Sequence, residues 1–152
     1  MMLLAAIEPS TLSSLRQHYA LAQSKESSAD KLIELTKDSK EALMIAYNGA
    51  AHVFLANHYL NPYSKLTTLN TGLKSINQAV NSSTEDLEIR FIRFSIEENI
   101  PAYVPFTSHL ANDKAFILQK ISKQHSYFST MKAYLLASAS LSAQEKAMIK
   151  SL

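Results

Sequence analysis

The sequence predicts an all-α protein. Only 2 glycines and 4 prolines occur in 152 residues, which leaves few residues for the turns of an all-β fold. The segments between them are rich in alanine, leucine, serine, lysine, glutamine and glutamate, a composition that favours helices. No segment alternates cleanly between apolar and polar residues, so no strand is predicted. We expect about eight helices, arranged as antiparallel neighbours in one domain over residues 1–152.

Capping residues and apolar spacing set where each helix is expected to begin and end. The helices are expected to begin at Pro9, after Ser27, after Asp38 or Ser39, at Tyr63, at Glu85, after Asn112, at Ser126 and after Ser142. The expected ends are the polar run 23–28 for the first helix, then Leu60 for the third, Val80 for the fourth, Asn99 for the fifth and Ala139 for the seventh. Asn61-Pro62 ends the third helix, because the residue before a proline disfavours the helical conformation. Ser142 and Glu145 form the sequence pattern of a capping box.

Both glycines fall inside predicted helices. Gly49 lies in the third helix and Gly72 in the fourth, and a glycine inside a helix costs about 1 kcal/mol relative to alanine. Small residues at such positions usually mark the close approach of a neighbouring backbone. We therefore expect the third and fourth helices to pack tightly through their small faces.

Residues 87–101, LEIRFIRFSIEENIP, are apolar around almost the whole circumference of the predicted fifth helix. A helix of this kind is buried among other helices. It also carries two of the three arginines, and Arg90, Arg93 and Glu97 share one narrow stripe. We expect this helix to form the centre of a helical domain with a polar seam.

The charged stripe has two interpretations. In the first it is structural, with Asp86–Arg90 and Arg93–Glu97 pairs one helical turn apart. In the second the arginines face a groove and hold a carboxylate of a partner peptide through forked hydrogen bonds.

Aromatic residues outside this helix define a second candidate surface, with Tyr59, Tyr63, Tyr103 and Phe106 as its main members. The loop segment 100–106, IPAYVPF, is unusually apolar. It should either tuck onto the core or present an apolar patch, and we favour tucking because loops beside a buried helix commonly cover its end.

Several segments alternate large and small residues as repeat proteins do. They are Tyr47-x2-Ala50-Ala51-x2-Phe54, Gly72-x3-Ile76 with Ala79, Leu12-x2-Leu15-Arg16-x2-Tyr19, Phe91-x2-Phe94-Ser95-x2-Glu98 and Tyr127-x2-Thr130-Met131-x2-Tyr134. Together they resemble the tetratricopeptide repeat, which reads W-x2-L-G-x2-Y and then A-x3-F over about 34 residues. The copy that begins at Leu12 lies 35 residues before the copy at Tyr47, and the copy at Phe91 begins 44 residues after Tyr47.

The resemblance implies helical hairpins stacked as a short right-handed array, with Tyr47 and Phe91 buried between helices. Glu98 and Arg16 depart from the pattern. The stretch 89–101 also resembles a signature of small bacterial helical proteins of uncharacterised function, which implies the same fold and supplies no activity.

No catalytic or cofactor motif is present. The chain has no cysteine, and no two of its five histidines have the spacing of a metal site within one helix. Two glycines are too few for a phosphate-binding loop, and no nucleophile motif occurs. We expect no enzymatic activity, cofactor or metal.

Charge and hydropathy limit the partners. A formal net charge of +2 without a dense basic block does not indicate nucleic acid, and no apolar run is long enough to span a bilayer. The apolar start, Met1–Ile7, is either a terminus that packs on the first helix through Leu3 and Leu4 or the remnant of a trimmed signal peptide. A cytoplasmic location is favoured, with export as the alternative if a signal was removed.

We expect a non-enzymatic interaction module that receives a protein or peptide. The candidate contact residues are Arg90, Arg93, Glu97, Asn99, Tyr63 and Tyr103. The alternatives are a small helical ligand-binding protein or enzyme that uses Glu97, Glu98 and nearby tyrosines, and a structural subunit that dimerises through residues 100–106.

Overall fold

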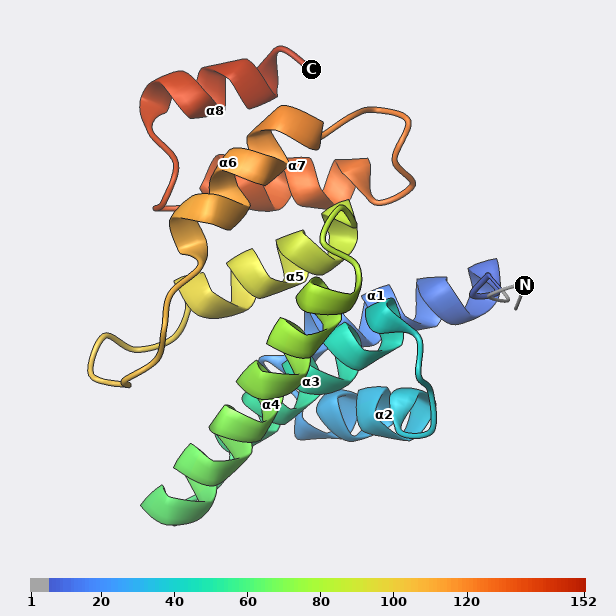
Figure 1. The fold of residues 1–152 in the computed structure, drawn as a ribbon, viewed down its shortest axis with the longest axis vertical. Helices are drawn as coiled ribbons and strands as arrows, with labels where there is room; N and C mark the ends of the chain where they lie inside the picture. The colour runs from blue at the N-terminus through green and yellow to red at the C-terminus, as the bar shows by residue number, and fades with distance from the viewer. Residues whose placement is uncertain (1–5) are drawn as a thin grey trace. The chain divides into compact units, whose positions relative to one another are not determined.

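The computed structural model describes residues 6–152, and this part of the chain contains helices and no strand (Figure 1). The helices are α1 (Pro9–Ala22), α2 (Glu26–Thr36), α3 (Ala42–Ala56), α4 (Pro62–Ser82), α5 (Leu87–Glu98), α6 (Leu110–Lys120), α7 (Phe128–Ala137) and α8 (Ala143–Lys150). The prediction of an all-α fold with about eight helices is confirmed. Within residues 6–152, no helix combines the length and the hydropathy needed to cross a membrane. Leu3 and Leu4 lie outside the described residues, so their expected packing stays a prediction.

The chain divides into two compact units, one of residues up to 79 and one of residues 80–152. The boundary falls in the last turn of α4. The expectation that the whole chain forms one domain stays a prediction.

In the first unit, α2 packs against both α1 and α3. Leu15, Leu32 and Tyr47 are fully buried where these helices meet. The ring of Tyr19 from α1 lies 5.6 Å from the ring of Tyr47 and 5.5 Å from that of Phe54, measured between centroids. These tilted and edge-on aromatic contacts attach α1 to α3.

The glycines explain how α4 joins this unit. A Cβ atom added to Gly49 would lie 2.6 Å from the carbonyl oxygen of Gly72, and one added to Gly72 would lie 2.5 Å from that of Gly49. Neither glycine has a positive φ, so close approach and not backbone conformation requires them. The prediction that the third and fourth helices pack tightly through glycine is confirmed.

Several helix ends in this unit differ from the predictions. The N-cap of α3 is Glu41, so the predicted caps Asp38 and Ser39 were wrong. Ser27 lies inside α2, whose N-cap is Lys25, so its predicted capping role was wrong. α3 ends at Ala56, and the side chain of Leu60, predicted to lie near the helix end, is exposed. Asn61-Pro62 is a true break: Oδ1 of Asn61 accepts hydrogen bonds from the backbone N–H groups of Tyr63 and Ser64, at 2.9 and 3.2 Å, and so caps α4.

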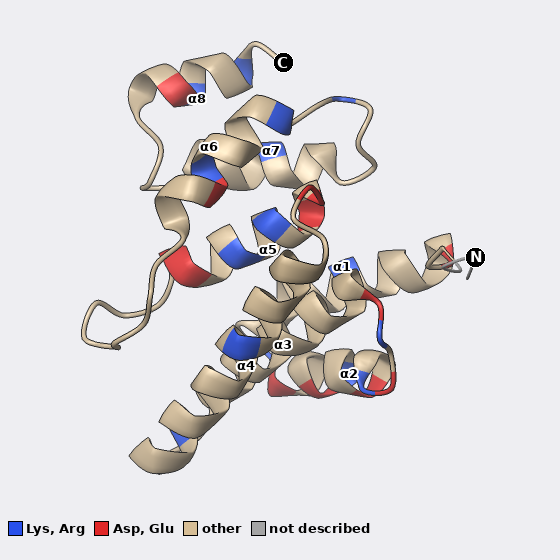
Figure 2. Cartoon of the chain, in the orientation of Figure 1, with Lys and Arg blue, Asp and Glu red and all other residues tan. Residues whose placement is uncertain are grey.

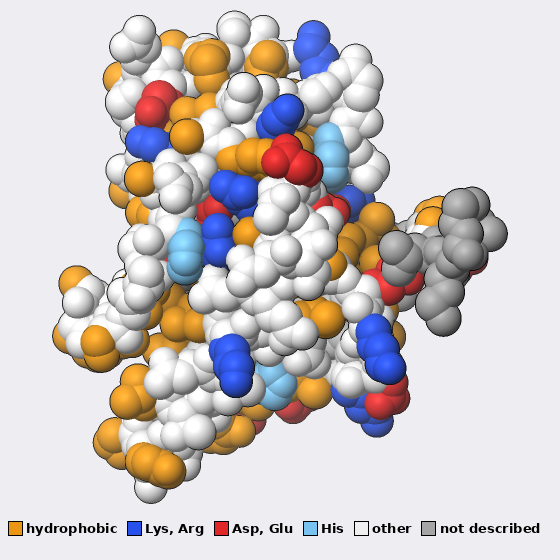
Figure 3. Space-filling model, viewed as in Figure 1, with side chains coloured by type: hydrophobic (Ala, Val, Ile, Leu, Met, Phe, Trp, Pro, Cys, Tyr) orange, Lys and Arg blue, Asp and Glu red, His pale blue; other side chains and the backbone are white. Residues whose placement is uncertain are grey.

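α4 has an unusual composition for an exposed helix. It contains no aspartate or glutamate, and its only charged residues are Lys65 and Lys74 (Figure 2). Hydrophobic side chains are exposed around its amino end (Figure 3). These side chains belong to Tyr59, Leu60, Tyr63 and Leu66.

In the second unit, α5 is the most buried helix. All of its twelve residues except Arg90 and Glu98 are buried. Its amino end is capped by Asp86, whose Oδ1 accepts a hydrogen bond from the backbone N–H of Ile89 at 2.9 Å. The prediction of a buried central helix is confirmed for this unit.

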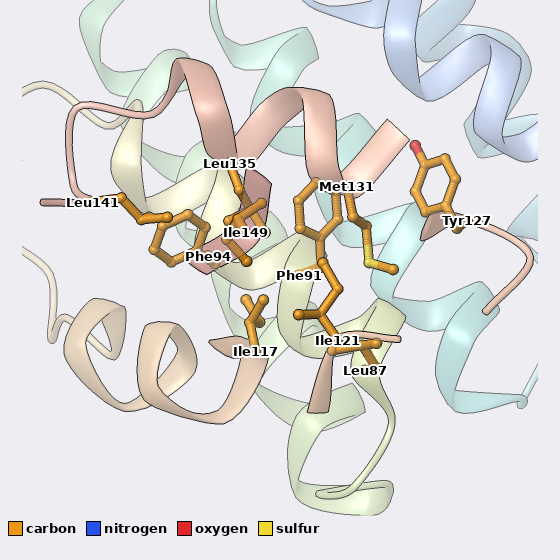
Figure 4. Packing of buried hydrophobic residues seen from close by; sticks show 10 residues of the cluster. All are labelled: Leu87, Phe91, Phe94, Ile117, Ile121, Tyr127, Met131, Leu135, Leu141 and Ile149. Atoms are coloured by element: carbon orange, nitrogen blue, oxygen red, sulfur yellow. The ribbon is translucent and has the colours of Figure 1, made fainter. Parts of the chain in front are cut away.

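The other helices of this unit surround α5 and share one apolar core (Figure 4). Phe91 and Phe94 from α5 pack with Ile117 from α6, Met131 from α7 and Ile149 from α8. The ring of Phe91 lies edge-on to those of Tyr127 and Tyr134, at centroid distances of 6.0 and 5.3 Å. These contacts bring all four helices of the unit into one packed cluster.

Two caps complete the second unit. Ser142 and Glu145 form both hydrogen bonds of the predicted capping box at the start of α8. The backbone N–H of Ser142 is the largest influence on Glu145, and it lowers the pKa of that carboxyl. Asn112 lies inside α6, whose N-cap is His109, so the predicted cap of this helix was wrong.

Candidate functional site

The two arginines of α5 converge on one carboxylate of α6. Nε of Arg90 lies 2.5 Å from Oδ1 of Asp113. Arg93 donates from Nε to Oδ2 at 2.7 Å and from an Nη to Oδ1 at 2.9 Å, which is a forked, bidentate pair. Asp113 is fully buried, and the side chains of Arg90 and Arg93 are 14% and 7% exposed. We call these three residues the Asp113 cluster.

Burial makes the Asp113 cluster sensitive to the loss of any member. An ion pair removed from water is stabilised only if its remaining hydrogen-bonding groups are also satisfied. Arg90 meets this requirement by donating to the backbone carbonyl oxygens of Thr84 at 3.0 Å and Asn112 at 3.4 Å. Its guanidinium carbon also lies 4.4 Å from the ring centroid of Phe116.

Glu97, one turn after Arg93, contacts the residue that precedes α6. Its Oε2 accepts a hydrogen bond from the backbone N–H of His109 at 2.7 Å, and its Oε1 lies 2.8 Å from Nδ1 of the same residue. The carboxylate thus holds the first residue of α6 through both its backbone and its ring. A negative charge at the amino end of a helix is also favourable to the helix dipole.

Glu98 makes its contacts on another side of α5. It accepts hydrogen bonds from the hydroxyl groups of Tyr134, at 2.8 Å, and Ser138, and from the backbone N–H of Ser140 at 3.2 Å. Burial raises the pKa of Glu98, but the hydrogen bonds from Ser138, Tyr134 and Ser140 together hold the pKa below its ordinary value. A strongly raised carboxylate pKa would favour the alternative of a ligand-binding protein or enzyme that uses Glu98. The arrangement instead holds this group as an anion.

Asn99 is the C-cap of α5. Its Nδ2 donates to the backbone carbonyl oxygen of Ser95 at 2.8 Å and to the hydroxyl oxygen of Tyr134 at 3.0 Å. One of the predicted contact residues therefore closes its own helix and joins it to α7.

Two of the six predicted contact residues are strongly exposed. Tyr63 in α4 is 79% exposed, and Tyr103 in the loop after α5 is 84% exposed. They belong to different units. The structure thus brings together Arg90, Arg93, Glu97 and Asn99 on α5, with the side chains of the first three directed to α6 and the residue before it.

The loop 100–106 covers the core less than expected. Tyr103 projects from it, both prolines are exposed, and Val104 and Phe106 are partly buried. The expectation of a segment tucked onto the core was wrong for Tyr103, and for Phe106 it stays a prediction. The loop is bounded by the Glu97–His109 contact, which brings its two ends together.

Tyr63 belongs to a compact apolar surface around the α3–α4 turn. Leu60 is 99% exposed, and Tyr59 and Leu66 are also exposed. We call these four residues the turn patch. Apolar side chains that gather on a surface mark interaction sites more often than apolar side chains that are exposed singly.

Asp113 was not predicted from the sequence. A signal for it existed, because a buried helix with two arginines needs a carboxylate partner, and Asp113 is the only acidic residue of α6. Sequence spacing alone does not show that α6 lies beside α5.

Neither a search for metal ligands nor a comparison with known proteins assigns a function to this chain. In residues 6–152, no group of three or more histidine, aspartate or glutamate side chains could hold a metal ion. No family model, no curated protein and no solved structure matches this chain.

Proposed function

We propose that the chain is a non-enzymatic protein-interaction module built from tetratricopeptide-like helical hairpins, and that it binds partners through the turn patch. The burial of Tyr47 and Phe91, 0% and 1% exposed, supports the hairpin architecture that the resemblance implies. The ring contacts of Tyr19 with Tyr47 and Phe54 join residues of two neighbouring repeat-like segments, as expected for a stacked array.

The observation that carries the proposal is the exposure of Leu60 and Tyr63 on either side of the Asn61-Pro62 break, where Asn61 caps α4. Exposed leucine and tyrosine side chains on a pre-ordered backbone can bury apolar area at little cost in conformational entropy. The arginines of α5 are less suited to this role. Asp113 already occupies the forked position that a partner carboxylate would take.

The turn patch favours one kind of partner. Lys65 is exposed beside it, and α4 presents its amino end there and contains no acidic residue. The amino end of a helix and a lysine both attract negative charge. The partner is therefore a protein segment with an apolar centre flanked by a carboxylate.

Site-specific photo-crosslinking tests this proposal. A photoreactive amino acid is placed at position 63, inside the turn patch, or at position 70, where Asn70 is exposed further along α4. The proposal predicts partner adducts from position 63 only, and predicts that Leu60→Ser removes them. Equal adducts from both positions, or adducts that persist in Leu60→Ser, would contradict it.

Sedimentation at several protein concentrations identifies the case in which the partner is a second copy of the chain. In that case the apparent mass rises with concentration in the wild type and stays constant in Leu60→Ser.

A further inference from the structure

The charges of the second unit are unevenly distributed along the chain. Residues 114–152 contain six lysines and a single carboxylate, Glu145, which gives a formal charge of +5 with histidine neutral. Residues 80–113 contain two arginines and six carboxylates, a formal charge of −4. The formal charge of the second unit is therefore small, but its residues 114–152 are strongly basic. They form most of α6 and all of α7 and α8.

Internal pairing removes little of this positive charge. Lys114 pairs with Glu145 at 3.2 Å and donates to the backbone carbonyl oxygen of Ser140 at 3.1 Å. Within the described part of the chain, the other lysines of residues 114–152 have no carboxylate within ion-pair distance. These are Lys120, Lys123, Lys132, Lys146 and Lys150.

Three of these lysines lie close together on α7 and α8, which pack against each other. Nζ of Lys132 lies 3.3 Å from the backbone carbonyl oxygen of Lys150. Lys146 is one helical turn before Lys150 and so shares its side of α8. In Figure 2 basic residues lie on α6, α7 and α8, and the only acidic residue on α8 is Glu145. We call Lys132, Lys146 and Lys150 the lysine face.

We propose that the lysine face docks an acidic, Asp/Glu-rich segment of a protein partner. Unpaired surface cations of one sign attract and orient a segment of the opposite charge, and they act mainly on association rate and specificity. Lys120 and Lys123 add to the same positive field. The surface lies in the second unit and shares no residue with the turn patch.

The side chains around the lysine face favour a polypeptide over a nucleic acid or a membrane. Single-stranded nucleic acids are usually bound with exposed aromatic rings on which bases stack. Of the described residues 80–152, the exposed large hydrophobic side chains are Tyr103, in the loop before α6, and Met148. One methionine is also too little apolar surface for insertion into a membrane interface.

Fluorescence anisotropy with a labelled Glu-rich peptide tests the proposal on the full chain. The test variant is Lys146→Gln/Lys150→Gln, which leaves Lys132 in its contact with the end of α8. The matched control is Lys37→Gln/Lys40→Gln, two exposed lysines of the first unit. Each variant lowers the formal net charge from +2 to 0, so a general effect of net charge affects both equally.

The expected result is a loss of affinity of about fivefold in the test variant and less than about twofold in the control. Binding by the wild type should also weaken strongly when the salt concentration is raised from about 0.05 M to about 0.5 M. An equal loss in both variants, or no binding by the wild type, overturns the proposal.

Two further probes distinguish other classes of partner. A single-stranded RNA or phosphatidylserine vesicles that bind the wild type more tightly than the peptide, with the same dependence on Lys146 and Lys150, would replace the acidic segment as the ligand. The lysine face and the turn patch have no residue in common. The substitution Leu60→Ser, which tests the turn patch, should therefore leave the affinity for the Glu-rich peptide unchanged.

Discussion

Gly49 of α3 and Gly72 of α4 approach each other so closely that each leaves no space for a side chain on the other. A Cβ atom at either position would lie 2.5–2.6 Å from the carbonyl oxygen of the facing glycine. Contacts below 3.0 Å require the backbone to shift, and here both obstacles are backbone atoms of a packed helix. The separation of α3 and α4 is therefore set by the absence of two methyl groups.

We predict that Gly49→Ala destabilises the first unit by about 1–3 kcal/mol, because overpacking outweighs the gain of about 1 kcal/mol in helix propensity. Chemical denaturation followed by circular dichroism measures the change. Asn70→Ala, at an exposed position of α4, is the control and should be neutral or slightly stabilising. A Gly49→Ala protein as stable as this control would show that the helices separate at little cost.

The Asp113 cluster predicts a large effect from a small chemical change. Asp113→Asn keeps the size of the side chain but leaves Arg90 and Arg93 without their buried counter-charge, and should cost about 3–5 kcal/mol. Asp86→Asn makes the same substitution at the cap of α5, where asparagine serves about as well, and should cost less than about 0.5 kcal/mol. Urea denaturation compares the two, and similar losses would argue against a structural role for the cluster.

Glu98 predicts a loss of stability in acid. Its pKa in the folded state lies below the ordinary value of 4.5, so the unfolded chain binds a proton more readily. The contribution of Glu98 is therefore fully present above pH 4.5 and is lost as the pH falls through the folded pKa. Thermal unfolding between about pH 7 and about pH 3 should show a smaller acid-induced decrease in Glu98→Gln than in the wild type. Identical pH profiles would contradict this assignment.

We predict a second pH dependence of stability, which arises from His52 in the first unit and occurs at higher pH than that of Glu98. Burial lowers the pKa of His52 below the ordinary value of 6.5. The unfolded chain therefore takes up a proton before the folded chain does, and this contribution to stability is lost as the pH falls from 6.5 through the folded pKa. Proton NMR titration of the imidazole should give a midpoint below 6.5. A midpoint at or above this value would show that the ring is open to water.

Local signals in the sequence predicted much of the fold. The capping box of Ser142 and Glu145 and the break at Asn61-Pro62 depend on residues a few positions apart. The facing glycines are 23 residues apart, but each was recognisable because glycine is costly inside a helix. The burial of α5 followed from its composition alone. These features were predicted because local chemistry determines them.

The candidate site was less predictable, because its contacts join distant parts of the chain. Arg90 and Asp113 are 23 residues apart, and Glu98 and Ser138 are 40 residues apart. The sequence suggested that the arginines pair with Asp86 and Glu97, and Asp113 was not considered. The direction in which an arginine side chain extends depends on the helix packed beside it, which sequence spacing does not show. The third helix was expected to reach Leu60 because Asn61-Pro62 follows it, whereas the helix ends at Ala56 and leaves the Leu60 side chain exposed.

The charged residues of α5 also have a consequence for how the second unit comes apart. Arg93 holds the first turn of α6, Glu97 holds the residue before it, and Glu98 holds the end of α7 and the start of the connection to α8. A single helix thus serves as the common anchor for its neighbours. Detaching α6 would expose the buried Arg93 and Glu97, and detaching α7 would break the hydrogen bonds that Glu98 accepts. Amide protons of α6 and α7 should therefore exchange with solvent together and at nearly the same rate as those of α5, as one cooperative block.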